Sequence, residues 1–265
     1  MPSSWADKLN FPLLLVIATG VTGLIWLIDL LFFAPKRKAS MRAENGELPI
    51  LVEYVQSFFP VLFVVLILRS FLFEPFRIPS GSMIPTLLVG DFILVNKFSY
   101  GVRLPVVHTK ILDTGSPERG DVAVFRYPLD PGLDYIKRVV GLPGDTVIYE
   151  GRQFVINGEP IPITGDTPYV SPVSESLVIG ATAREEVLGE TAHEILEFPG
   201  EQPKRSGTFT VPEGHYLMVG DNRDRSNDGR FWGFVPEENL VGEAKYIWMH
   251  WNGGVIWSRL MSAIK

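Results

Sequence analysis

Two long apolar stretches near the N-terminus constrain this chain more than any other feature. Phe11–Ala34 has 24 residues with one charged side chain, Asp29, near its far end. Tyr54–Phe73 has 20 residues, again with a single charge, Arg69. At about 1.5 Å per helical residue, about 20 residues cross the roughly 30 Å hydrocarbon layer of a membrane. We therefore expect two transmembrane helices.

Each stretch has an alternative interpretation. The first could be a cleaved signal peptide, but it is too long, lacks a basic leading segment and is followed by Lys36-Arg37-Lys38 where a small-residue cleavage site is needed. The second could be a buried core helix, because its uncharged part, Phe58–Leu68, has only 11 residues. Spanning is favoured there because Arg69 lies near the end and can extend its charge to the interface.

The positions of the basic residues predict the orientation. The N-terminal tail offers only Lys8, offset by Asp7. The segment between the two stretches is richer in charge, with Lys36, Arg37, Lys38 and Arg42 against Glu44 and Glu47. Because Lys and Arg are enriched in cytoplasmic loops, we expect this loop in the cytoplasm. The N-terminus and the roughly 190 residues after Phe73 then lie on the other side of the membrane.

The amino-acid composition argues against several classes of function. The 30 acidic and 24 basic residues give a net charge of −6. This balance argues against nucleic-acid binding, which needs a basic face. The chain has no cysteine, so disulfides, thiolate metal sites and cysteine nucleophiles are excluded.

The rest of the chain has the pattern of a β protein. Short β-branched and aromatic runs are separated by Gly, Pro and Asp, which is typical of a β-sandwich or barrel. The runs are Phe92–Val95, Val122–Tyr127, Tyr135–Val140, Thr146–Tyr149, Phe154–Ile156, Thr208–Val211, Tyr216–Val219 and Lys245–His250. Residues 151–206 are richer in Pro, Thr and Glu, and we interpret them as an inserted β-ribbon or cap subdomain. The core would comprise 77–150 and 207–265, after a membrane anchor at 1–76.

The histidines give no sign of catalysis. His108, His193, His215 and His250 have no metal-ligand spacing, and no G-x-S-x-G motif accompanies them. We expect them to be surface or packing residues, which argues against a histidine-based serine hydrolase.

A serine-containing turn follows the second apolar stretch. In Pro79-Ser80-Gly81-Ser82-Met83-Ile84-Pro85-Thr86-Leu87, the two prolines restrict the backbone and Gly81 permits a tight turn. Ser82 would then be presented on a rigid loop. Taken alone, the segment is better explained as a polar turn that leaves the membrane.

A lysine lies in the middle of an apolar strand. Alternation within Asp134–Asp145 places Tyr135, Lys137 and Val139 on one face. A solvated lysine has a pKa near about 10.4, and burial lowers it by disfavouring the ammonium. Lys137 could then serve as a general base, although most lysines are surface charges.

The segment Gly220–Arg230, GDNRDRSNDGR, is dense in hydrogen-bonding groups. Asp224, Ser226 and Asp228 match the first ligand positions of an EF-hand, but Val235 stands where that calcium site requires a glutamate. We therefore predict a buried network of ion pairs that supports a site. The alternative is a solvated loop.

In combination these segments resemble bacterial type I signal peptidase (leader peptidase), a membrane-bound serine protease. The resemblance covers nearly the whole chain: two spans with a basic loop, Pro79–Leu87, Tyr127-Pro128, Asp134–Asp145 and Gly220–Gly233. It implies a mostly β catalytic domain with a signal-peptidase-like fold behind two N-terminal transmembrane helices. Some members carry a disulfide in the insertion, which this chain cannot form.

The resemblance also implies residue roles. Ser82 would be the nucleophile and Lys137 the general base, with Ser80 and the Ser82 N–H forming the oxyanion hole. Ser226, Asp228 and Arg230 would orient and support the lysine, and Phe125, Tyr135 and Met218 would form an apolar wall around it. The substrate-binding residues would be Ile78, Ile136, Tyr135 and Met83. Arg225 and Gly229 depart from some relatives, without touching these positions.

The function implied is cleavage of signal peptides from exported preproteins after small residues (Ala-X-Ala), without metal or cofactor. The chain would be a multi-pass protein of the bacterial inner membrane, with its catalytic domain on the periplasmic side, next to lipid and the secretion translocon. We also expect one or two of Trp232, Trp248, Trp251 and Trp257 to lie at the lipid interface.

Two rival functions stay open at this point. One is a membrane-tethered β domain that binds a partner or calcium through Gly220–Gly233. The other is a different serine–lysine protease, such as the self-cleaving SOS repressors, which are soluble and linked to DNA.

Overall fold

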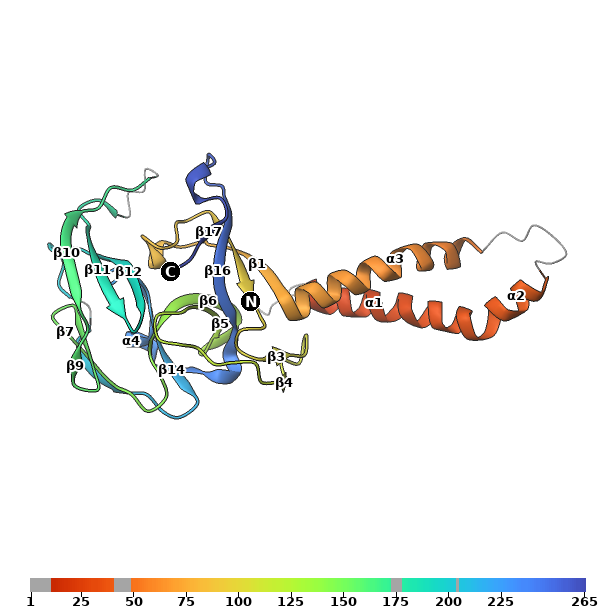
Figure 1. The fold of residues 1–265 in the computed structure, drawn as a ribbon, viewed down its shortest axis with the longest axis horizontal. Helices are drawn as coiled ribbons and strands as arrows, with labels where there is room; N and C mark the ends of the chain where they lie inside the picture. Colours follow the sequence, from red (N-terminus) through yellow and green to blue (C-terminus); the bar gives the residue numbers. More distant parts are fainter. Residues whose placement is uncertain (1–10, 41–48, 173–177, 204) are drawn as a thin grey trace, which may run out of the picture. The chain divides into compact units, whose positions relative to one another are not determined.

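The computed structural model describes residues 11–40, 49–172, 178–203 and 205–265. The chain divides into two compact units (Figure 1): residues 1–72 with 103–111, and residues 73–102 with 112–265. The charges that predict the orientation lie partly outside the described residues, namely Asp7, Lys8, Arg42, Glu44 and Glu47.

The first unit contains the two expected apolar helices. α1 (Phe11–Ile28) continues through a π-helical turn into α2 (Ala34–Ser40), and α3 (Ile50–Ile67) continues through a second such turn to Leu72. The continuous stretches Phe11–Arg37 and Ile50–Leu72 are long and apolar enough to cross a membrane. The second helix begins at Ile50, four residues before the predicted start, and ends because Phe73 opens the first strand.

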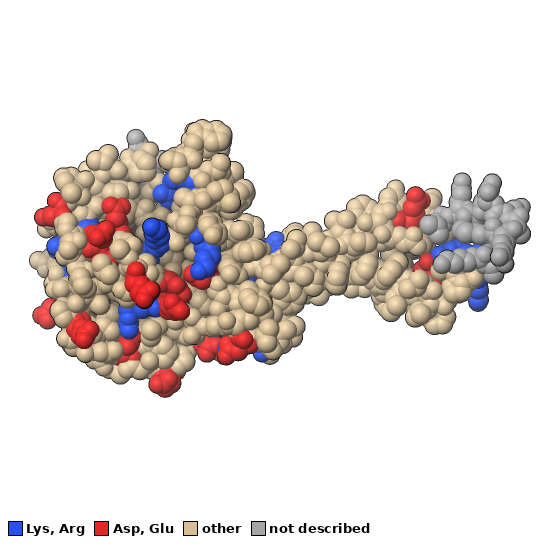
Figure 2. Space-filling view, viewed as in Figure 1, with Lys and Arg blue, Asp and Glu red and all other residues tan. Residues whose placement is uncertain are grey.

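The two helices pack on each other through a close contact. Trp26 and Phe59 stack with ring centroids 5.4 Å apart. Gly23 allows this approach, since a Cβ there would lie 2.7 Å from the Phe59 ring. Many other apolar side chains of both helices are exposed, and Figure 2 shows hardly any charge along most of their length. This surface suits a hydrocarbon environment.

The second unit is built from strands, and two short strands, Val102–Arg103 and Lys110–Leu112, fall partly in the segment 103–111 of the first unit. In chain order the strands of the described residues are β1 (Phe73–Arg77), β2 (Asp91–Asn96), β3 (Val102–Arg103), β4 (Lys110–Leu112), β5 (Val122–Tyr127), β6 (Asp130–Gly141), β7 (Thr146–Glu150), β8 (Gln153–Ile156), β9 (Glu159–Pro160), β10 (Ile163–Pro168), β11 (Thr182–Leu188), β12 (Thr191–Glu197), β13 (Gly207–Thr210), β14 (His215–Val219), β15 (Val235–Pro236), β16 (Leu240–His250) and β17 (Ser262–Ala263). A short helix, α4 (Gly229–Trp232), precedes β15.

The largest sheet has eight strands in the order β1-β2-β16-β5-β6-β14-β15, with β17 paired to β16. A four-stranded sheet has the order β13-β7-β8-β9, and a three-stranded sheet the order β10-β11-β12. The mostly β fold predicted from the sequence is confirmed. Every β-rich run predicted from the sequence coincides with a strand, with Val211 one residue beyond β13.

The predicted insertion, residues 151–206, is divided between two sheets. β8 and β9 pair alongside β7 and β13, which flank the insertion, while β10, β11 and β12 form a sheet of their own. Leu196 at the end of β12 also forms a parallel bridge with Asn222. The insertion is therefore joined by backbone hydrogen bonds to the loop that follows β14.

Strand β6 lies inside the large sheet and carries Lys137. This strand pairs with β5 on one side and β14 on the other. Val139 on β6, Phe125 on β5 and Met218 on β14 belong to one buried apolar cluster. A second buried cluster contains Ile78 and Met83, on either side of the serine turn.

Candidate active site

Ser82 lies in a short 3₁₀ turn, Gly81–Met83, that follows β1. The backbone before this turn is fixed by Ile78, whose N–H donates to Asp91 O at 2.8 Å and whose carbonyl accepts from Gly90 N–H at 2.9 Å. Met83, the last residue of the turn, is fully buried. Ser82 is thus held on an anchored loop and is itself only half-buried.

Lys137 meets this serine from β6. Its Nζ lies 2.6 Å from Ser82 Oγ and 2.8 Å from the carbonyl oxygen of Ile136. The side chain is 4% exposed. Burial lowers the pKa of the Lys137 ammonium from its ordinary 10.5 to about 8, although Asp228 and Asp221 act in the opposite direction. At pH 7 about a tenth of this amine is then neutral, against fewer than about one in a thousand for a solvated lysine.

The alternation of β6 explains why a lysine is buried here. Lys137 shares its strand face with Tyr135 and Val139. Tyr135 packs against the apolar cluster that also contains Val139, Phe125 and Met218. The Lys137 Nζ lies 5.5 Å from the centre of the Tyr135 ring. These apolar neighbours exclude water from the amine, as the sequence pattern predicts.

A cleft of about 460 Å³ opens over the two side chains. It is lined by Pro79, Ser80, Gly81, Ser82, Asp134, Tyr135, Ile136, Lys137, Asn222, Arg225 and Asn227. Of the residues predicted to bind substrate, Tyr135 and Ile136 line the cleft. Ile78 and Met83 do not, because both are buried in the cluster against which Ile136 packs.

Ser80 is at the edge of the same cleft. Its Oγ lies 3.5 Å from Ser82 Oγ, and the side chain is exposed. Ser80 directly precedes the Gly81–Met83 turn that contains the Ser82 backbone N–H, so the two groups are close together in the chain.

The loop after β14 carries the ion-pair network predicted for it. Asp228 accepts hydrogen bonds from Arg230 Nε and Nη2, each at 2.8 Å, and from the Gly220 N–H at 3.0 Å. Burial opposes ionisation of Asp228, but Arg230 outweighs it and lowers the pKa of the carboxyl. Both side chains are buried. The polar loop is thus folded inward.

Ser226 is buried beside Asp228 and helps to lower its pKa. The hydroxyl makes no well-formed hydrogen bond among the described residues, and none joins it to Lys137. Gly220 lies close to both serines, since a Cβ added there would be 2.2 Å from Ser226 Oγ and 2.5 Å from the Ser82 carbonyl oxygen. Gly220 therefore lets the loop and the serine turn come into contact.

Asn222 was not predicted as a site residue. Its backbone N–H donates to the Ser82 carbonyl at 3.1 Å, and its Nδ2 donates to the Gly81 carbonyl at 3.0 Å. Three further lining residues were also not predicted: Asp134, Arg225 and Asn227. All four lie in segments that the sequence analysis singled out, but residue spacing alone does not tell which side chains of a loop face a cleft.

The four histidines lie away from the cleft lining. His250 Nδ1 is 2.9 Å from Asp91, and His215 Nδ1 lies 2.9 Å from the Glu213 carbonyl. His193 is buried between Glu186 and Asp221. Within the described residues, no group of three or more His, Asp or Glu side chains could hold a metal ion.

Comparison with known proteins identifies the family. Residues 51–251, more than half of the chain, match the family model "Signal peptidase, peptidase S26". The chain belongs to the signal peptidase I family. A signal peptidase I of Pseudomonas fluorescens is 51% identical, over 92% of this chain and 93% of that protein. The signal peptidase I of Pseudomonas aeruginosa is 50% identical, over the same shares of the two chains.

A crystal structure of a signal peptidase I from Enterococcus faecalis is also similar, with 28% identity and a TM-score of 0.33, covering 48% of this chain and 96% of that one. Membership of the signal peptidase I family makes the chain a serine endopeptidase that removes signal peptides from preproteins. Its two apolar helices agree with membrane anchoring.

Proposed function

We propose that Ser82 is the nucleophile of this endopeptidase and Lys137 its general base. The observation that carries this assignment is the 2.6 Å separation of Lys137 Nζ and Ser82 Oγ, with the amine buried and its pKa lowered to about 8. A general base works best when its pKa lies near the working pH. No histidine lines the cleft among the described residues, which favours the lysine for this role.

The chemistry proceeds in two halves. The neutral Lys137 amine takes the proton of the Ser82 hydroxyl as Oγ attacks the scissile carbonyl carbon. The resulting ammonium then gives its proton to the leaving amine, and an acyl-enzyme on Ser82 results. In the second half Lys137 takes a proton from water, the hydroxide attacks the ester, and the ammonium returns the proton to Ser82 Oγ.

The Ser80 hydroxyl and the Ser82 N–H would stabilise the oxyanion formed in both halves. Their position on one turn, with the two hydroxyl oxygens 3.5 Å apart, supports this pairing. Each such donor is typically worth about 10²–10³ in rate.

Lys137 would be supported by three residues of the loop after β14, namely Ser226, Asp228 and Arg230. Asp228 raises the pKa of Lys137 and so limits the effect of burial. Because Asp228 is fixed by Arg230, its distance to the amine is fixed as well. Ser226 would orient the amine once the substrate is bound.

The substrate would bind as an extended strand beside Glu74–Ser82 and Asp134–Lys137. Tyr135 and Ile136 would contact its side chains directly. Ile78 and Met83 would act through Ile136, which packs on their cluster. Shallow apolar pockets of this kind would select small residues at positions −1 and −3 of the preprotein.

We further propose that the chain is a multi-pass protein of the bacterial inner membrane with its β unit on the periplasmic side. The apolar helices and the basic segment between them support this arrangement. Trp251 and Trp257 are 53% and 76% exposed, which supports contact with lipid. Proximity to the secretion translocon would follow from the substrate.

Preprotein cleavage by the full chain in detergent micelles tests the assignment. Ser82→Ala and Lys137→Met should each abolish cleavage, while substitution of His108, His215 or His250 should leave it near the wild-type rate. Full activity of Ser82→Ala or Lys137→Met would refute the assigned roles.

A further inference from the structure

The paired strands β11 and β12 carry three buried ionisable side chains, two of which, Glu186 and His193, lie opposite each other. Glu186 and His193 are direct partners in the antiparallel register. Glu186 is fully buried and His193 is 5% exposed. The neighbouring pair, Glu185 and Glu194, is exposed on the other face. Because a buried ionisable group is costly unless it is paired, the partners of Glu186 and His193 are informative.

Glu186 binds the guanidinium of Arg223 in a bidentate pair, with both N–O distances 2.5 Å. Both side chains are fully buried. The Arg223 N–H donates to the Leu196 carbonyl at 2.9 Å, and the Leu196 N–H donates to the Asp221 carbonyl at 2.9 Å. The insertion therefore holds the backbone on both sides of Asn222.

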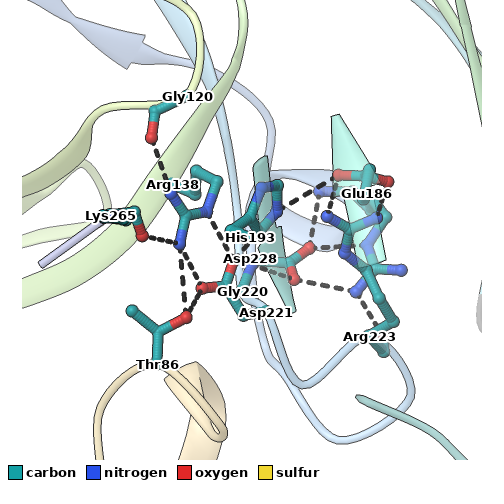
Figure 3. A network of polar contacts seen from close by, with 11 residues as sticks. Thr86, Gly120, Arg138, Glu186, His193, Gly220, Asp221, Arg223, Asp228 and Lys265 are labelled. Carbon is teal, nitrogen blue, oxygen red and sulfur yellow. Dashed lines mark hydrogen bonds and ion pairs between the residues drawn. The ribbon is translucent and has the colours of Figure 1, made fainter. Parts of the chain in front are cut away.

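His193 lies between two carboxylates (Figure 3). Its Nε2 is 3.3 Å from Glu186 Oε2 and 3.8 Å from Asp221 Oδ1. Asp221 accepts from Arg138 Nε at 2.8 Å and Nη2 at 2.6 Å, and from Thr86 Oγ1 at 2.5 Å. His193 thus lies between the Glu186–Arg223 pair and the Asp221–Arg138 pair, and neither of its ring nitrogens has a well-formed hydrogen bond among the described residues.

Asn222 stands between these two anchored residues and holds the serine turn. It donates to the carbonyls of Ser82 and Gly81 at 3.1 and 3.0 Å. The Ser82 N–H and Oγ belong to the same turn, so a displacement of Asn222 changes where both point. A displacement of about 1 Å can cost about 100-fold in rate.

From this geometry we infer that Glu186 and His193 are positioning residues for the reaction: they clamp residues 221–223 and so hold Ser82 in register with Lys137. The inference rests on the proposed role of Ser82 as nucleophile. The inserted strands then serve as part of the catalytic scaffold.

Steady-state and single-turnover cleavage of a preprotein by the full chain in micelles tests this. Glu186→Gln, His193→Gln and the double variant are compared with Glu185→Gln and Glu194→Gln, which make the same carboxylate-to-amide change on the exposed face. Assays are run well below the melting temperature of each variant, and rates are expressed per folded molecule.

We expect kcat of Glu186→Gln and His193→Gln to fall by about 10- to 100-fold with KM within about twofold. The double variant should lose little more than Glu186→Gln, because both residues act through Asn222. Because Asp221 also raises the pKa of Lys137, kcat is compared on the plateau of the pH profile, above about pH 8, where the amine is neutral in every variant. The two control variants should match the wild type.

The inference is wrong if Glu186→Gln and His193→Gln lower the melting temperature but keep kcat per folded molecule at the value of the control variants. It is also wrong if these variants shift the apparent pKa of the pH–rate profile and keep full activity on its plateau. If Glu186→Gln does not fold, His193→Gln decides alone. Ser82→Ala separates the proposed nucleophile from the proposed positioning residues. An active Ser82→Ala would refute the role of Ser82 as nucleophile. An inactive Ser82→Ala together with a fully active His193→Gln would refute only the positioning role.

Discussion

The amine of Lys137 lies 2.6 Å from the hydroxyl oxygen of Ser82, although 55 positions of sequence separate the two residues. The amine comes from a strand in the middle of the large sheet, and the hydroxyl from the turn that follows the edge strand β1. The lysine is 4% exposed, so its protonation is governed by burial rather than by bulk water.

The pH dependence of kcat/KM should report this burial. With a pKa of about 8 for Lys137, kcat/KM should rise with pH and level off above about pH 8, since only the neutral amine accepts the serine proton. Peptide cleavage between pH 5 and 10 measures the rise. A profile that is flat from pH 6 to 9 would contradict the assigned base.

Lys137→Met should stabilise the fold in a pH-dependent way. The pKa of Lys137 is 10.5 in its ordinary state and about 8 when folded, so between these pH values the unfolded chain binds more protons and stability rises with pH. Below pH 8 the free energy of unfolding of the wild type is reduced by the full cost of burying the Lys137 ammonium, about 3 kcal/mol at most.

The free energy of unfolding of Lys137→Met should therefore exceed that of the wild type at pH 7. The excess should shrink as pH rises from 8 to 10.5. Urea titrations at several pH values measure the difference, and a wild type that is as stable as the variant at pH 7 would count against the buried ammonium.

Ser80→Ala should slow the reaction without weakening binding. Removal of one oxyanion donor lowers kcat by about 10²–10³, while KM changes little because the charge arises only in the transition state. Ser80→Thr keeps the hydroxyl and serves as the control. A loss of less than about threefold in Ser80→Ala would exclude Ser80 from the oxyanion hole.

Gly220→Ala should separate the loop from the serine turn. The added Cβ would lie 2.5 Å from the Ser82 carbonyl oxygen and 2.2 Å from Ser226 Oγ, so the backbone must shift. We expect a loss of about 1–3 kcal/mol in unfolding free energy and of about 100-fold in kcat. Gly200→Ala, with no atom within 4 Å of its Cβ, should behave as the wild type.

Local sequence pattern predicted much of the fold. Val122–Tyr127 and Tyr216–Val219 coincide with β5 and most of β14, because β-branched and aromatic residues fit a half-buried pleated surface. The helices followed from length and hydrophobicity alone. By contrast, β10, β11 and β12 were not delimited, since Thr and Glu are frequent in them and their pairing depends on tertiary contacts.

The site was predicted only in part from the residues themselves. Alternation of β6 indicated a buried Lys137, but its contact with Ser82 depends on how the sheet brings distant segments together, and that expectation came from the family resemblance. Asn222 and Glu186 gave no local signal. Glu186 is in a polar run, and its partner Arg223 is 37 positions away, so only the folded chain reveals that it is buried.

Direct titration of the Lys137 amine tests whether burial lowers its pKa as a general base requires. The full chain, labelled with ¹⁵N at lysine Nζ and held in micelles, is followed by NMR as pH rises, and the Lys137 signal is assigned by its loss in Lys137→Met. We expect a midpoint of about 8. A midpoint at or above about 10, the value of a solvated lysine, would contradict it.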